Sequence, residues 1–428
     1  MSVNAMPVPE PWIRRYWRDK ATWTTIADVF AILAALTLPW STTLPSIFVP
    51  CWLGAVAWVT DWRAFGRLLQ QPICYVPLAF TALAAAGTLW SDAAWNARLW
   101  SVGPLLKLLL LPGLFYHFAR SKRGMWVFIA FLVSCTLLMV MSWIVLIDPG
   151  LSLKPPAERA PGIFVKNYID QSQEFALCAV ALAYPIVRLV QANRLWPAML
   201  LVALSLLFLV NMSFVIVSRT AMVTIPVMIA AFALLHLKWR TSLMISCGLV
   251  VVAGLAFAAS PLLQQRAEAI VSEYQAYKQQ NVASSVGLRL EYWRKSLQFF
   301  AAAPVVGSGT GSTLGLFQKA ASGTGEAATA QVIRNPHNQT LAVAVQWGVV
   351  GVVLLYAMWF VHLRLFRGDG LVAWIGLLVV VQNIFTSLFN SHIFDFHEGW
   401  MYVLGVGVAG GMILAERQRG TGASRAGS

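Results

Sequence analysis

The chain has 428 residues, of which 58% are hydrophobic and only 11% are charged. A soluble domain is about one quarter charged, so this composition excludes an ordinary water-soluble protein. The formal net charge of +14 does not indicate nucleic-acid binding, because the basic residues are scattered over short segments between apolar runs, where they report membrane topology.

Twelve apolar runs are long enough to cross a bilayer, and in lipid such runs form α-helices because every backbone group must bond internally. The predicted spans are roughly 22–39, 43–60, 73–90, 101–118, 125–147, 171–188, 196–217, 220–236, 241–259, 338–361, 371–389 and 399–415. The predicted fold is therefore an all-α, polytopic transmembrane bundle.

The basic residues orient these spans. Cytoplasmic loops of membrane proteins are enriched in Lys and Arg. With the N-terminus in the cytoplasm, 18 of the 31 basic residues fall on that side. They are Arg14, Arg15, Arg18, Lys20, Arg63, Arg67, Arg120, Lys122, Arg123, Arg188, Arg194, Lys238, Arg240, Arg364, Arg367, Arg417, Arg419 and Arg425. Both termini are thus expected in the cytoplasm.

Two outward segments are long, at residues 148–170 and 260–337. The second contains two helical stretches, 262–280 and 288–301, followed by a tract rich in Gly, Ser and Thr. We expect spans one to nine within residues 1–259, a periplasmic loop at 260–337, spans ten to twelve within 338–415, and a cytoplasmic tail at 416–428.

Arg219 stands in a very short outward turn, after Ser218. The positive-inside rule disfavours a basic residue there. If Ser218 caps the next helix, Arg219 also opposes the helix dipole, by about 0.3–1 kcal/mol. It is either an arginine that snorkels to the headgroups or a site for a phosphate group, which guanidinium binds bidentately.

His337 follows Asn335 and Pro336 and precedes a long apolar run. With Asn335 as cap and Pro336 at the first helical position, His337 is expected in the first turn of a transmembrane helix. The positive end of that helix favours a neutral imidazole, the form required of a general base. The alternative is a structural histidine at the membrane interface.

Three weaker features lie on the outward side or near it. Arg289 and Trp293 are expected to share a helix face. The tract Gly307–Ser312 is either a phosphate cradle of backbone amides or a flexible turn. Lys107 lies inside the fourth span, where an ionisable residue indicates a functional site unless it snorkels.

A possible metal set occurs near the last outward loop, comprising His392, Asp395, His397 and Glu398. Its spacing fits no familiar zinc pattern, and we expect neither a metal nor another cofactor. The five cysteines lie in or beside apolar runs without a CxxC pair, which indicates packing residues.

The motifs Gly287-Leu-Arg289-x-x-x-Trp293, Pro304-x-x-Gly307-x-Gly309-x-Gly311, His337-Asn338-x-x-Leu341 and Gly348-x-x-Gly351 occur in this order. Together with the topology and the Ser218-Arg219 turn, they resemble the O-antigen ligase and polymerase superfamily of bacterial inner-membrane glycosyltransferases of the GT-C type. Gly162 and Asn167 loosely match a further Gly/Asn stretch of that family.

The resemblance implies transfer of a glycan from undecaprenyl diphosphate to a hydroxyl of lipid A-core at the periplasmic face, without a metal. It places the essential His at His337 and the essential Arg residues at Arg219 and Arg289. We also expect Asn338, Trp293 and Lys107 to contact the substrate. The implied localisation is the bacterial inner membrane.

Four alternatives stay open. An O-antigen polymerase uses the same donor but extends another lipid-linked glycan, and a protein O-oligosaccharyltransferase modifies protein. A transporter or lipid flippase would carry ionisable residues in several spans, whereas Lys107 is expected to be the main deep charge. A structural membrane scaffold would not explain basic residues at outward helix mouths.

Overall fold

A computed structural model describes the chain from residue 19 to residue 426, apart from residues 217 and 326. Over these residues the protein consists of α-helices and short 3-10 helices, with two isolated β-bridges. The predicted all-α class is confirmed. Arg14, Arg15 and Arg18, which were used to orient the N-terminus, lie outside the described residues.

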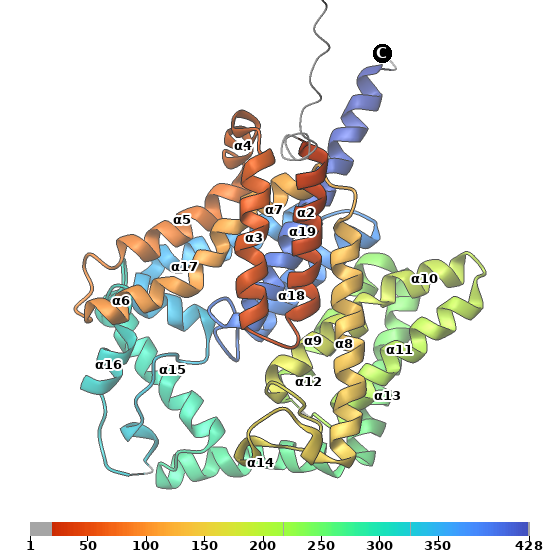
Figure 1. Cartoon of the computed structure of the whole chain (residues 1–428). Helices are drawn as coiled ribbons and strands as arrows, with labels where there is room; N and C mark the ends of the chain where they lie inside the picture. The colour runs from red at the N-terminus through yellow and green to blue at the C-terminus, as the bar shows by residue number, and fades with distance from the viewer. Residues whose placement is uncertain (1–18, 217, 326, 427–428) are drawn as a thin grey trace, which may run out of the picture.

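Each predicted span coincides with one helix or with consecutive helices (Figure 1). They are α2 (Lys20–Thr37), α3 (Thr43–Val59), α5 (Pro72–Ala86), α6 (Trp95–Val102) with η1 (Gly103–Leu110) and α7 (Leu111–Phe118), α8 (Gly124–Ile147), α9 (Tyr168–Ala181) with α10 (Ala183–Gln191), α11 (Leu195–Phe214), α12 (Arg219–His236), α13 (Trp239–Ala259), α17 (Gln339–Leu365), α18 (Leu371–Thr386) and α19 (Phe396–Ala426).

These helices differ in length. Among the described residues, seven helices are long and apolar enough to cross a membrane, or eight if α3 and the short α4 (Trp62–Leu69), bent by 114°, form one span. α5 and α18 have only 15 and 16 residues, fewer than the roughly 20 that a helix needs to cross the hydrocarbon core. The polytopic character is thus confirmed, while the count of twelve spans stays a prediction.

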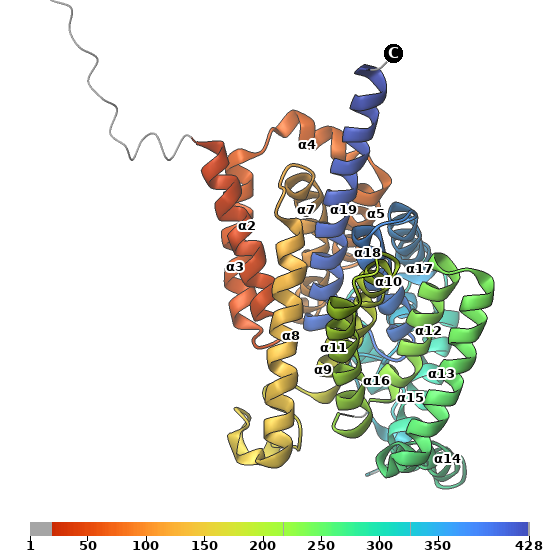
Figure 2. The ribbon, with the colours of Figure 1, turned by 90° about the vertical axis from the view of Figure 1, so that its right-hand side faces the viewer.

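α19 runs through the middle of the bundle (Figure 2), and 78% of its apolar window is buried. Glycines let α19 approach α7 closely. A Cβ on Gly407 would lie 2.5 Å from Leu114, and one on Gly411 would lie 2.6 Å from Phe118. Close approach of backbones at small residues is how helices associate in lipid, where burial of apolar surface drives little.

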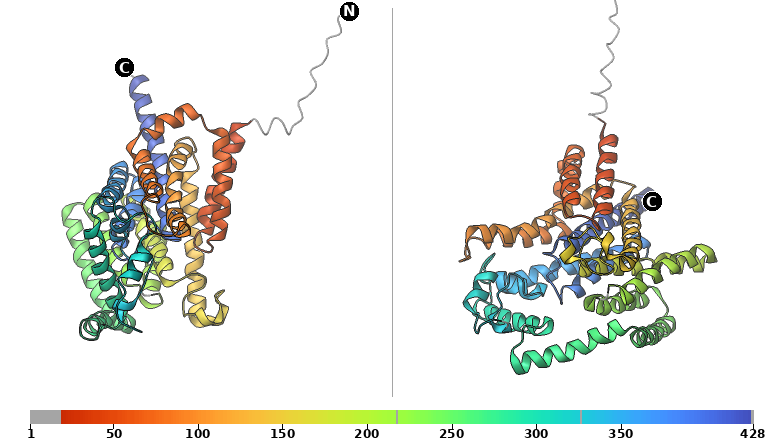
Figure 3. Two further views of the ribbon diagram at one scale, coloured as in Figure 1. Left: turned by 90° about the vertical axis from the view of Figure 1, so that its left-hand side faces the viewer. Right: turned by 60° about the horizontal axis from the view of Figure 1, so that its bottom comes forward.

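The second long outward segment folds into α14 (Pro261–Gln280), α15 (Ser285–Ala302) and α16 (Thr313–Lys319). The first two coincide with the helical stretches predicted from the sequence. α14 and α15 lie along the edge of the molecule opposite its C-terminus (Figures 1 and 3). The first long outward segment contains the single-turn η2 (Pro149–Leu151) and η3 (Pro156–Glu158) and ends in the first turn of α9.

α17 is broken at Gly348, whose φ of 60° and ψ of −155° are not helical. The backbone groups freed by the break find partners in the segment that follows α15. The N–H groups of Val349 and Val350 donate to the carbonyls of Pro304 and Val305, at 2.8 and 3.2 Å. Non-helical backbone within an apolar bundle is tolerated only where such partners exist.

The glycine tract, residues 307–312, forms hydrogen bonds with the part of α17 that precedes the break. The N–H groups of Ser308 and Gly309 donate to the carbonyls of Val345 and Gln346, both at 2.9 Å. The N–H of Gly311 donates to Gln346 Oε1 at 2.8 Å. Because these amides are already bonded to α17, the hypothesis that the tract cradles phosphate is wrong.

Candidate active site

His337 lies immediately before α17, not in its first turn as predicted. Asn338 is the N-cap, and its Oδ1 accepts the N–H of Leu341 at 3.0 Å. Asn335 forms a local turn instead, with its Oδ1 accepting the N–H of His337 at 2.9 Å. His337 takes a φ of 53°, a left-handed conformation uncommon for residues other than Gly.

The imidazole of His337 is oriented by residues between α18 and α19. Its Nδ1 lies 2.9 Å from Oδ1 of Asn390, and Nδ2 of Asn390 donates to Oδ2 of Asp395 at 2.8 Å. The carboxylate accepts hydrogen bonds, so the NH₂ group of Asn390 must face it. The amide oxygen therefore faces His337, and Nδ1 of His337 must carry the hydrogen. This assignment leaves the lone pair on Nε2.

α15 forms one wall beside His337. The ring of Tyr292 stacks on the imidazole, with centroids 6.2 Å apart and an interplanar angle of 29°. On α15, Arg289 precedes Tyr292 by three residues, and Trp293 follows Tyr292 directly. Residues three or four apart share a helix face, so the predicted shared face of Arg289 and Trp293 is compatible with α15. Both side chains are partly buried.

α15 is held in place by a polar cluster that the sequence did not reveal. Glu291 accepts hydrogen bonds from Arg294 at 2.6 and 2.9 Å and from Tyr277 of α14 at 2.9 Å. The Arg294 contacts, helped by Tyr277, hold the pKa of Glu291 below its usual value against the opposing effect of burial. Lys295 donates to the carbonyl of Thr329 at 2.6 Å. These contacts tie α15 to both neighbouring segments.

Arg219 is the first residue of α12, as the sequence predicted. Its side chain lies outside the described residues, so its position relative to His337 stays a prediction. The preceding Ser218 is the N-cap residue but makes no side-chain capping bond.

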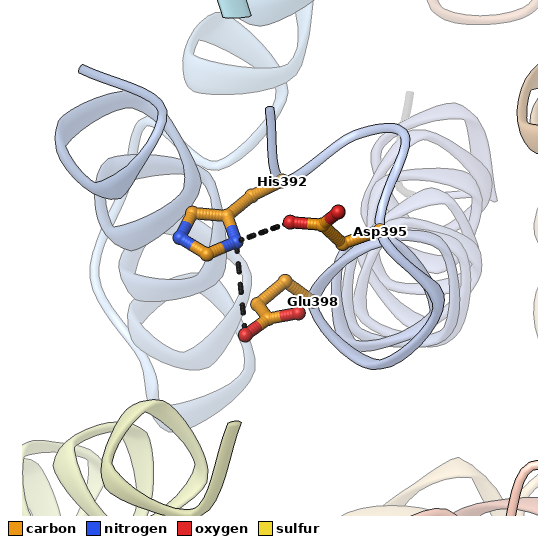
Figure 4. A group of neighbouring side chains, drawn as sticks. All are labelled: His392, Asp395 and Glu398. Carbon is orange, nitrogen blue, oxygen red and sulfur yellow. Dashed lines mark ion pairs between the residues drawn. The ribbon is translucent and has the colours of Figure 1, made fainter. Parts of the chain in front are cut away.

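Three of the four residues considered as a metal set, His392, Asp395 and Glu398, point toward one another (Figure 4). Nδ1 of His392 lies 3.2 Å from Asp395 and 3.6 Å from Glu398. One potential ligand atom from each lies within 4.8 Å of the others, which a metal ion requires. His397 diverges and pairs with Asp170 of α9 at 2.8 Å.

A protonated His392 balances the charge of Asp395 and Glu398 without an ion. Burial of the ring opposes protonation, but the carboxylates of Glu398 and Asp395 outweigh it and raise the pKa of His392 to about 10. The imidazolium then balances the two carboxylates, and Asp395 remains an acceptor for Asn390. We therefore assign this cluster to holding the loop before α19.

Lys107 reaches the same loop. It lies in η1, and its ammonium donates to the carbonyl of Asp395. Gly399 makes room for it, because a Cβ there would collide with the lysine side chain. Lys107 is buried, so it does not snorkel. Its partner is a backbone carbonyl of the loop that orients His337, which favours a supporting position over direct contact with a substrate.

The first outward segment contains the loosely matched Gly162 and Asn167. Asn167 caps α9, its Oδ1 accepting the N–H groups of Ile169 and Asp170 at 2.8 and 2.9 Å. Gly162 has a φ of 77°, and its carbonyl accepts the hydroxyl of Ser142 at 2.7 Å. The loose Gly/Asn match thus corresponds to a turn and a helix cap, which are structural features.

The structure thus brings together His337, Asn390, Asp395 and Tyr292, with Arg289 and Trp293 on the adjoining helix. Asn390 and Tyr292 were missed from the sequence. A polar or aromatic residue in an outward segment was the only sequence signal for either of them. Many residues in these segments share that character, and only the contacts with His337 distinguish Asn390 and Tyr292.

Comparison with known proteins gives one family match. Residues 204–356 match the model of a family described as O-antigen ligase. The matched range runs from α11 to the second half of α17 and includes Arg219, Arg289 and His337. No curated protein matches the chain. The family match supports the resemblance drawn from the motifs, and it extends over residues 204–356 of the chain.

Proposed function

We propose that this protein is an O-antigen ligase of the bacterial inner membrane. It transfers a glycan from undecaprenyl diphosphate to a sugar hydroxyl of lipid A-core at the periplasmic face, with inversion and without a metal. One observation carries the proposal: Asn390 and Asp395 fix His337 as the tautomer with a free lone pair on Nε2, beside the helix that bears Arg289.

In the proposed step the acceptor hydroxyl oxygen attacks the anomeric carbon of the donor sugar. The bond from that carbon to the diphosphate oxygen breaks, and its electron pair leaves with undecaprenyl diphosphate. The hydroxyl proton passes to Nε2 of His337, which contributes about 10²–10⁴-fold as a general base. A single displacement of this kind inverts the anomeric carbon.

Arg219 and Arg289 are assigned to the diphosphate. Negative charge develops on the leaving group as the glycosidic bond breaks. Preorganised cationic donors stabilise such charge, and the loss of one donor costs about 3–4 kcal/mol in comparable sites. Guanidinium also binds phosphate oxygens in a bidentate manner. Trp293 and Asn338 are proposed to contact the sugars or the diphosphate near these groups.

Replacing His337 by Ala is expected to abolish transfer while binding of the lipid-linked donor survives. Transfer is measured with purified protein, and donor binding is measured separately by titration of the lipid-linked glycan. Activity at the wild-type level in this variant would contradict the assignment of His337 as the base.

The decisive experiment supplies the purified protein with a polyprenyl-diphosphate glycan and one of two acceptors. Product on lipid A-core supports the ligase, whereas extension of a second lipid-linked glycan indicates a polymerase. A chelator forms a further arm. We expect unchanged transfer with it, and a loss restored by added metal would assign an ion to the cluster of His392, Asp395 and Glu398.

A transporter is the candidate from a different class. Lys107 is expected to be the main deep charge, and Asp28 and Glu174 are also buried, in α2 and α9. Asp28 and His117 bond each other at 2.8 Å, and Glu174 bonds Lys166 at 2.7 Å. Such local pairing favours a structural role. Absence of product with every acceptor would favour the transporter.

A further inference from the structure

A pocket lined by both charged and apolar residues lies at the end of α17 opposite His337. It is formed where α10, α12 and α17 end and α18 begins, and its volume is about 820 Å³. Pockets that bind small ligands commonly enclose about 300–1,000 Å³. The pocket shares no residue with the candidate active site, so it requires an explanation of its own.

The rim of this pocket is basic. Arg188, Arg364 and Arg367 line it, and Asp369 is the single acidic residue among its lining residues. Asp369 contacts Tyr184 at 3.1 Å and His236 at 3.7 Å. Over the described part of the chain, no ion pair is formed by the three guanidinium groups. Their charge is available to an anionic ligand.

The walls of the pocket are apolar and aromatic. Phe360, Leu363 and Leu377 line it together with Phe232 and Trp374. The rings of Phe232 and Trp374 are packed edge to face, with centroids 4.9 Å apart. A ligand that fills this pocket therefore needs a hydrocarbon part as well as negative charge, which a free phosphate ion lacks.

We propose that this pocket binds an anionic phospholipid of the membrane leaflet opposite the active site, with its phosphate at the arginines and its acyl chains against the aromatic wall. Basic pockets between transmembrane helices on the cytoplasmic side bind such headgroups. The assignment to the cytoplasmic leaflet rests on the proposed topology, but binding is independent of glycan transfer.

A competing explanation exists for two of the arginines. Arg188 and Arg364 lie in the last turns of α10 and α17, where a cation is stabilised by the helix dipole alone. The control must therefore include an arginine in the same situation. Arg67 lies in the last turn of α4, and Arg63 is one turn before it. Neither lines the pocket.

The test uses the full-length protein, purified and delipidated in detergent and titrated with phosphatidylglycerol, phosphatidylethanolamine or inorganic phosphate. Native mass spectrometry counts the bound lipids. We expect phosphatidylglycerol to bind in preference to phosphatidylethanolamine. The double variant R364Q/R367Q should lose about 30-fold in affinity, because each arginine near a lipid phosphate contributes about 1 kcal/mol. R63Q/R67Q should bind like the wild type.

Equal losses in the two double variants would overturn the proposal, because they would indicate a diffuse surface effect. Equal binding of the two lipids, or binding of inorganic phosphate at the affinity of phosphatidylglycerol, would also overturn it. Folding is judged by elution as a single species. If R364Q/R367Q fails this criterion, the single variants R367Q and R63Q are compared instead, and R367Q is expected to bind phosphatidylglycerol more weakly than R63Q. Glycan transfer is measured separately, so failure here leaves the proposed ligase function intact.

Discussion

Replacing Asn390 by Ala removes the group that accepts the Nδ1 hydrogen of His337 at 2.9 Å. In the ground state this hydrogen bond joins neutral groups and contributes about 1 kcal/mol. When Nε2 takes the proton of the acceptor hydroxyl, the imidazole becomes charged and the same bond contributes about 1.5–3 kcal/mol. The differential loss of about 0.5–2 kcal/mol lowers kcat by about 2- to 30-fold. KM for the donor should change little, because the diphosphate is assigned to Arg219 and Arg289.

The assay is steady-state transfer by purified protein, with kcat and KM determined separately. Asn383 of α18 provides a matched control. Its Oδ1 accepts Nε1–H of Trp359 at 3.0 Å, so N383A removes a buried amide without touching His337. An unchanged kcat in N390A, or equal losses of kcat in N390A and N383A, would refute the positioning role of Asn390.

Three further outcomes are expected. Arg219→Glu should weaken binding of the lipid-diphosphate donor, and unchanged affinity in a titration would count against its assignment. The pKa of His392 is raised from 6.5 to about 10, so its contribution to stability is present below 6.5 and is lost as the pH rises through about 10. The melting temperature in detergent should fall in that range for the wild type, whereas His392→Gln should melt lower at neutral pH and lack this fall. Gly348→Ala should destabilise the fold by about 1–3 kcal/mol, because its φ of 60° is left-handed. Gly54→Ala, where a Cβ meets nothing within 4 Å, should melt like the wild type.

The helical architecture was predictable because hydrophobic periodicity and chain length dominate in a membrane protein. α8 at Gly124–Ile147 and α14 at Pro261–Gln280 fall within a residue or two of the ranges expected from the sequence. The same information could not decide how long an individual helix continues. α5 and α18 are shorter than their apolar runs because each gives way to a turn at one end.

The candidate site was predictable in its residues but not in its contacts. Asn335 and Asn338 are both competent caps, and Asn338 prevails because its amide also donates to the carbonyl of Leu388 at 3.1 Å. That contact joins residues 50 positions apart, so no local pattern reveals it. The bond from His337 to Asn390 is of the same kind, which is why the tautomer became evident only from the structure.

The break in α17 has a consequence for the biogenesis of this membrane protein. The hydrogen-bond partners of Val349 and Val350 come from residues 304 and 305, which are synthesised before the helix that needs them. In the proposed topology, residues 304 and 305 cross the bilayer before α17 inserts, so the amides of Val349 and Val350 have their partners in place when α17 enters the lipid. Deletion of residues 304–311 should therefore impair insertion of α17, detectable as altered accessibility of its flanking loops.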